Sequence, residues 1–138
     1  MYRHLDIDEP FMGEWTRDVD NIPYALRERR EKMGSYSETE IRLARQALYA
    51  MSTHVDHQIR LVIGLLREEG LLDDTIIMFT ADHGDMLGNH GQFAKDMFYE
   101  DSAKIPMILM PQAERQDIGQ DRRDDRLAAQ ADIFPTLL

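Results

Sequence analysis

Apolar residues recur at three- and four-residue steps between residues 37 and 69. The recurring positions are Ile41, Ala44, Leu48, Met51, Val55, Ile59, Val62 and Leu66. This spacing places them on one face of a helix. Ser37 and Glu40 have the spacing of a capping box, and Gly70 is placed to end the helix in a left-handed conformation. The pattern predicts one long amphipathic helix over residues 37–69.

A different pattern follows the helix. Residues 76–79 form a continuous apolar run, Ile-Ile-Met-Phe, which stops at the polar sequence Thr-Ala-Asp-His-Gly. Such a run favours a strand buried on both faces, as in a parallel sheet. Residues 105–110 predict a second buried strand, with Pro106 near its start, where a missing amide donor is tolerated. Strands that alternate with helices indicate an α/β fold.

Asp82 and His83 follow the first predicted strand directly. Ligands of open α/β sheets bind beyond the carboxyl ends of strands, so this pair is the first candidate for function. A carboxylate with an imidazole suits a divalent cation such as manganese or zinc, while calcium prefers shells made of oxygen alone. Two ligands do not complete a metal site. The alternative is that Asp82 caps a turn beside a partly buried His83.

The next dozen residues strengthen the metal interpretation. Gly84, Gly88 and Gly91 let the backbone approach a ligand closely, and they bracket His90 and lead to Lys95. A lysine near a bound metal would place positive charge where an anionic tetrahedral ester needs stabilisation in its transition state.

Three stretches carry a family resemblance: TADHGDMLGNHGQFAK, FYEDSAKIPMIL and, near the end, DIFPTLL. They resemble the C-terminal metal-site segment of the sulfatase family, within the alkaline-phosphatase-like superfamily, over roughly residues 37–138. The resemblance implies part of an alkaline-phosphatase-like sheet flanked by helices. It also implies that Asp82 and His83 are metal ligands, that Lys95 contacts the sulfate ester, and that His90 is a pocket residue.

The activity implied by this resemblance is hydrolysis of a small sulfuric ester with a divalent metal, usually calcium. Phosphonate monoester and phosphate diester hydrolases of the same superfamily share the Asp-His pair, often with manganese, and remain an alternative. The family's formylglycine nucleophile comes from a C/S-x-P-x-R motif, which these 138 residues lack. We therefore expect a segment of a longer enzyme that is inactive by itself and stops in a helix capped by Asp132.

Composition narrows the classes of partner. The net charge of −10 argues against nucleic acid or an anionic membrane as a partner, because both require a basic surface. An anionic ester would need local cations, which makes a metal and Lys95 more necessary. The absence of cysteine excludes disulfides and thiolate metal sites. No apolar run approaches the roughly 20 residues of a membrane helix, and the first residues lack a signal-peptide pattern.

The pattern divides the chain at about residue 36. Residues 1–36 read as irregular apart from a short helical pattern at residues 24–33, and they are a candidate specificity region. Trp15 and Tyr24 would either line a pocket there or pin the segment to the core. Residues 37–138 read as one incomplete α/β domain, with a helical turn or two at residues 97–103 and a charged surface loop at residues 112–126.

A second class of function is a non-catalytic binding or assembly module. A partial fold would leave a sheet edge and the apolar helix stripe without partners, and such surfaces drive association, including homo-oligomers. His54 and His57 share a helix face, but without an intervening catalytic glutamate we expect structural or solvent roles for them. The sequence assigns no compartment.

Overall fold

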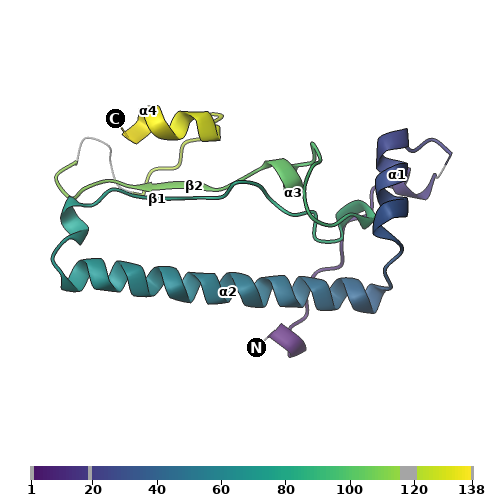
Figure 1. The fold of residues 1–138 in the computed structure, drawn as a ribbon, viewed down its shortest axis with the longest axis horizontal. Helices are drawn as coiled ribbons and strands as arrows, with labels where there is room; N and C mark the ends of the chain where they lie inside the picture. Colours follow the sequence, from purple (N-terminus) through teal and green to yellow (C-terminus); the bar gives the residue numbers. More distant parts are fainter. Residues whose placement is uncertain (1, 19, 116–120, 138) are drawn as a thin grey trace. The chain divides into compact units, whose positions relative to one another are not determined.

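A computed structural model (Figure 1) describes residues 2–18, 20–115 and 121–137. The chain forms two compact units. The first unit comprises Met1–Ile59 and His83–Lys104, and the second comprises Arg60–Asp82 and Ile105–Leu138. Helix α2 (Glu38–Glu68) passes from the first unit into the second. The second boundary falls between Asp82 and His83, the two residues of the predicted metal pair.

Helix α2 (Glu38–Glu68) confirms the long helix predicted from the periodicity. At its start the Ser37 N–H donates to the Glu40 carboxylate at 2.8 Å, and the Glu40 N–H donates to the Ser37 hydroxyl at 3.3 Å. At its end Gly70 has a φ of 68°, and the Leu71 N–H donates to the Leu66 carbonyl at 2.8 Å. The capping box and the left-handed terminator are both as predicted.

The apolar stripe of α2 is largely uncovered. Met51, Val55 and Val62 expose 57%, 53% and 60% of their surface, whereas the polar residues Arg45 and Gln46 are buried. The prediction of a helix from this periodicity is confirmed. Within the described parts of the chain, however, little apolar surface packs against this face.

The second unit contains a two-stranded sheet. Strand β1 (Ile77–Thr80) pairs with β2 (Met107–Met110) in antiparallel register, with Ile77 opposite Met110. The prediction of strands buried on both faces in a parallel arrangement is wrong for this pair: Ile108 is 60% exposed. A short apolar run specifies an extended backbone but neither the direction of its partner nor the layer above it. Pro106 directly precedes β2, as expected for a residue without an amide donor.

The second unit ends in a 3-10 turn (Gln130–Asp132) and helix α4 (Ile133–Leu137). Asp132 stands immediately before α4, but its carboxylate accepts the Ala129 N–H at 2.7 Å and so closes the 3-10 turn. The predicted N-cap bond to an N–H of α4 is not among the hydrogen bonds of the described residues. The predicted charged loop falls partly on residues 116–120, which lie outside the described residues. In the described part, hydrogen bonds from Arg126 hold the pKa of Asp124 well below its usual range.

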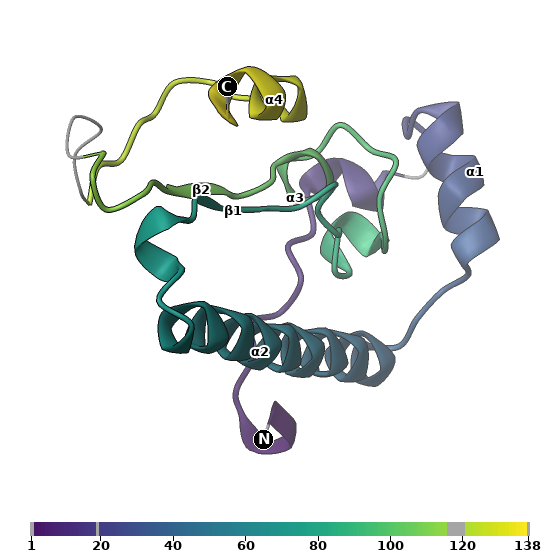
Figure 2. The same cartoon turned by 60° about the vertical axis from the view of Figure 1, so that its left-hand side comes forward.

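The first unit joins the N-terminal segment to the loop that follows β1. It contains 3-10 turns at Tyr2–His4, Glu14–Arg17 and Asn89–Gly91, helix α1 (Tyr24–Met33) and helix α3 (Glu100–Ala103). Figure 2 shows the turn at Glu14–Arg17 near this loop, and the rings of Trp15 and His90 lie 5.2 Å apart. Its buried apolar side chains, among the described residues, are Ile22, Met86 and Met97. Helix α1 matches its prediction, while α3 begins at Glu100 rather than residue 97.

The small sheet, the flanking helices and the long α2 confirm the α/β class predicted from the sequence. In the part of the chain that is described, no helix is both long enough and apolar enough to span a membrane.

Candidate active site

The side chain of His83 is held in one orientation by its neighbour. Its Nδ1 lies 2.7 Å from the Gly84 carbonyl oxygen. A carbonyl only accepts, so in the neutral ring Nδ1 carries the proton and Nε2 carries the lone pair. Metal-binding histidines commonly donate one ring N–H to a backbone carbonyl and bind through the other nitrogen. His83 therefore fits the role of a metal ligand through Nε2.

Asp82 lies two residues after the end of β1, and hydrogen bonds within the second unit hold its backbone in place. The Gln130 side-chain amide donates to the carbonyls of Ala81 and Asp82 at 3.0 and 2.8 Å. These bonds fix the main chain at the strand end and do not use the Asp82 carboxylate. Gln130 was not predicted as part of the site, because its contact spans 48 residues and leaves no local sequence signal.

Together Asp82 and His83 offer one carboxylate and one imidazole, which suit manganese or zinc. Among the described residues no group of three or more histidine, aspartate or glutamate side chains is placed to hold a metal. The pair therefore fits two positions of a coordination shell, and further ligands must complete it.

Gly84 lets the loop approach α3 closely. Its N–H donates to the Ser102 carbonyl at 2.8 Å. A Cβ atom at this position would lie 2.0 Å from the Asp101 carbonyl oxygen. A side chain there would collide with rigid backbone, so glycine is required for this contact and it fixes the chain directly after His83.

Asp85 organises the loop from within. Its Oδ1 accepts the N–H groups of Leu87 and Ala94 at 2.8 and 3.2 Å. Both residues have positive φ, 51° and 61°, a conformation that costs energy outside glycine. The carboxylate thus stabilises strained backbone between His83 and Lys95. The Asp-x-Leu spacing is that of an Asx turn and could have indicated this role from the sequence.

His90 lies in an aromatic cluster with Phe11, Trp15 and Tyr99. It is only 7% exposed, and its ring centroid lies 5.2 Å from Trp15 and 4.6 Å from Tyr99. Its Nδ1 accepts the Gly13 N–H at 3.2 Å.

Of the two predicted aromatic residues of the N-terminal segment, Trp15 packs in this cluster. Its ring is parallel to that of Tyr99 at a centroid distance of 6.0 Å, and burial raises the pKa of Tyr99. Of the two roles considered for Trp15, the structure supports the one in which its ring packs the N-terminal segment against the core. Tyr24 is 71% exposed and makes no such contact.

Lys95 is exposed at the end of the loop. Its carbonyl accepts a hydrogen bond from Arg29 of α1, which also donates to the Phe93 carbonyl at 3.2 Å. No ion pair with a described carboxylate engages its ammonium group, so its charge is available to a ligand. His83, His90 and Lys95 lie in the same compact unit. Arg29, which holds the backbone of Lys95, was not predicted from the sequence.

Comparisons with known proteins agree with the motif. A sequence model of the sulfatase family, described as Sulfatase, matches residues 14–138. An arylsulfatase of Clostridium perfringens is 35% identical over 143 residues, covering 100% of this chain and 28% of that protein. Arylsulfatase K of Gallus gallus is 31% identical over 126 residues, covering 90% of this chain and 23% of that protein.

A crystal structure of the phosphonate monoester hydrolase of Agrobacterium radiobacter matches with a TM-score of 0.69 and 32% identity. The match covers 74% of this chain and 20% of that one. The chain thus spans about a quarter of the length of the curated relatives it matches. A family model that matches nearly the whole chain, together with a relative aligned over all of it, decides the question of family: the chain belongs to the sulfatase family.

Proposed function

We propose that residues 82–95 supply part of the active site of a metal-dependent hydrolase of sulfuric esters. In this proposal Asp82 and His83 bind the divalent cation, Lys95 contacts the sulfate group, and His90 holds the pocket wall in place. The observation that carries the proposal is the 2.7 Å contact between His83 Nδ1 and the Gly84 carbonyl. It orients the imidazole as a metal ligand requires, at the position where the family motif has one.

Charge supports the same assignment. The chain has a net charge of −10, so it repels an anionic ester except where cations are concentrated. Lys95 is an exposed cation within the motif loop, and its backbone is held by Arg29. A bound divalent cation would add Lewis-acid stabilisation of the ester oxygens. Lys95 would then neutralise charge on the same sulfate group.

The reaction also needs a nucleophile, and the family's formylglycine motif has no counterpart in these 138 residues. We therefore propose that this chain alone binds metal and ester but does not turn the ester over. Incubation with 4-nitrophenyl sulfate and added metal should release no nitrophenol above the buffer rate. Sustained release abolished by Lys95→Ala would contradict this part of the proposal.

A second candidate is hydrolysis of a phosphonate monoester or phosphate diester. The similarity to the Agrobacterium radiobacter phosphonate monoester hydrolase favours it. The two candidates differ in the anion preferred by the metal-loaded chain. Calorimetry can measure both affinities. Tighter binding of inorganic sulfate than of methylphosphonate supports the sulfatase hypothesis, and the reverse order supports the phosphonate hydrolase hypothesis.

The decisive experiment is titration of the chain with Mn²⁺, Ca²⁺ and Zn²⁺ by calorimetry. The variant carries Asp82→Ala and His83→Ala. The matched control carries Asp56→Ala and His57→Ala, which removes the same residue pair from an exposed face of α2.

Because the pair supplies only part of a shell, we expect affinity between micromolar and millimolar for at least one metal. That binding should be lost in the first variant and retained in the control. Metal binding that is the same in all three proteins would refute the assignment of Asp82 and His83. A proton-coupled nitrogen NMR spectrum adds an independent check, since metal addition should shift Nε2 of His83 and leave Nδ1 protonated.

A further inference from the structure

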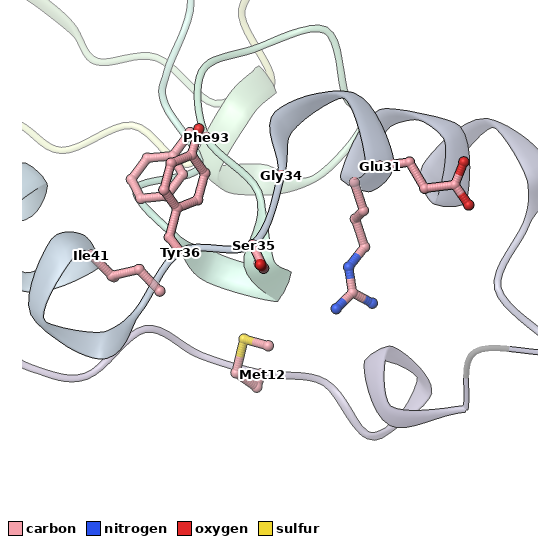
Figure 3. Close-up of a pocket in the computed structure, with 9 residues that line it drawn as sticks. Met12, Glu31, Gly34, Ser35, Tyr36, Ile41 and Phe93 are labelled. Atoms are coloured by element: carbon pink, nitrogen blue, oxygen red, sulfur yellow. The ribbon is translucent and has the colours of Figure 1, made fainter.

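A cavity of about 460 Å³ lies within the first unit, next to the loop that carries Lys95 (Figure 3). It is lined by residues of four segments: Met12; the end of α1 and its connection to α2; Ile41 of α2; and the loop residues Gly91 and Phe93. Its volume falls in the range of pockets that bind small organic molecules. None of the four candidate site residues Asp82, His83, His90 and Lys95 lines it, so it is distinct from the metal pair.

One wall of the cavity is aromatic and aliphatic. The rings of Tyr36 and Phe93 pack edge to face, with centroids 5.1 Å apart and an interplanar angle of 77°. Ile41 and Met12 extend this wall, and in Figure 3 the four side chains face the same space. Tyr36 and Met12 remain 44% and 39% exposed, so apolar surface is available to a ligand. A ring or alkyl group would bury it.

The cavity lining also includes a guanidinium group, that of Arg30. Its Nη1 donates to the Thr16 carbonyl at 3.0 Å, which fixes the side chain. Its Nε and Nη2 face Gly91, where a Cβ atom would lie 3.6 and 3.7 Å from them. Among the described residues, no hydrogen bond or ion pair uses either nitrogen.

The Nε and Nη2 edge of a guanidinium is the one that binds a carboxylate or sulfate with two parallel hydrogen bonds. Glu31, the acidic residue of the lining, points its carboxylate away from Met12 and Ile41 (Figure 3). The cavity therefore combines a fixed oxyanion-binding edge with an apolar wall.

The cavity borders the segment that carries Lys95. Arg29, the neighbour of Arg30 on α1, donates to the carbonyls of both Phe93 and Lys95. Phe93 lines the cavity, and two residues of extended chain span at most about 7 Å. One small molecule can thus reach from the apolar wall to the Lys95 segment.

We propose that this cavity binds the organic part of the ester, and that this part is an apolar ring or chain with a second anionic group. Arg30 binds the second anion, and the Tyr36–Phe93 pair packs on the apolar body. The inference rests on the proposed function and narrows its substrate class to esters with two negative charges. It also gives the region of residues 1–36 its specificity role, because Met12 and Arg30 both come from it.

The test uses 4-hydroxybenzoate, the alcohol that hydrolysis of a carboxylated aryl sulfate would release. Its binding to the whole 138-residue chain is followed by NMR titration, with phenol and inorganic sulfate as truncated probes. Because a charge-assisted bidentate contact is lost, Arg30→Gln should weaken binding about tenfold. Lys32→Gln is the matched control, since Lys32 is a cation of the same helix paired with Glu28 instead. It should leave the affinity unchanged.

Arg30→Lys keeps the charge but not the planar fork, and it should weaken binding nearly as much as Arg30→Gln while the spectrum of the free protein stays native. Equal affinity in wild type and Arg30→Lys, or equal binding of phenol and 4-hydroxybenzoate, would overturn the inference. The Asp82→Ala, His83→Ala variant separates the two proposals. Hydroxybenzoate binding that survives in it, alongside lost metal binding, supports the cavity as a separate subsite of the proposed enzyme. Retained metal binding refutes the proposed metal pair and not the cavity.

Discussion

Gly84→Ala should loosen the loop that carries the candidate active site. The added methyl group would lie 2.0 Å from the Asp101 carbonyl oxygen and 2.9 Å from its carbonyl carbon. Both atoms belong to backbone, so no side-chain rotation relieves the collision. The loop must move away from α3, which also breaks the 2.8 Å hydrogen bond from Gly84 to Ser102.

The magnitude follows from these two losses. Overpacking a tight contact costs about 1–3 kcal/mol, and a lost backbone hydrogen bond costs about 1 kcal/mol. We expect the local opening free energy of the loop to fall by roughly 3 kcal/mol. Amide hydrogen exchange measures it directly, since the Met86 and Gly88 N–H groups donate to carbonyls within the same loop. Their protection should fall by about two orders of magnitude.

Gly64→Ala is a control that should stabilise the protein locally instead of destabilising it. Gly64 lies in α2, and a Cβ atom there would meet nothing within 4 Å. Alanine in a helix interior is favoured over glycine by about 0.5–1 kcal/mol, so this variant should slow exchange along α2. If Gly84→Ala exchanges like wild type while Gly64→Ala behaves as stated, the close approach of the loop to α3 is wrong.

Three further variants test individual contacts. Hydrogen bonds from Ser37 lower the pKa of Glu40, so this pair stabilises α2 above the ordinary glutamate pKa and the effect fades as pH falls through the lowered value. Circular dichroism between pH 6 and pH 3 should show helix loss that Ser37→Ala makes smaller, and an unchanged profile would contradict the capping box. Asp85→Ala removes the acceptor of two loop amides and should increase their exchange by about tenfold or more, whereas unaltered exchange would exclude its organising role. His90→Ala should shift the fluorescence of Trp15, the single tryptophan, to longer wavelength, because its ring loses a packing partner; an unmoved emission maximum would refute the cluster.

Elements defined by neighbours in sequence were predictable. The capping box joins Ser37 and Glu40, which are three positions apart, and the terminator at Gly70 depends on one backbone conformation. The same holds for Pro106 before β2. In each case the interaction that decides the structure is local, so the residue types carry it.

Contacts between distant segments were not predictable. Gly13 and His90 are 77 residues apart, and the sequence around each residue does not indicate that the Gly13 N–H donates to the imidazole. The direction of β1–β2 pairing is a similar case. Apolar runs of this length fit parallel and antiparallel partners equally well, and the partner decides which face is covered.

The candidate site also has a part that was predictable from local sequence and a part that was not. The motif identified Asp82, His83 and Lys95 because their order along the chain matches the family, but it did not show how they are held. The structure adds a carbonyl that orients His83, a glutamine that fixes the backbone at Asp82, and an arginine that holds the backbone at Lys95. All but the first come from elements far away in sequence. Each of these contacts is a hydrogen bond to backbone. The motif therefore sets which residues are proposed to bind the metal and ester, whereas the fixed backbone beneath Asp82 and Lys95 depends on long-range packing that no motif encodes.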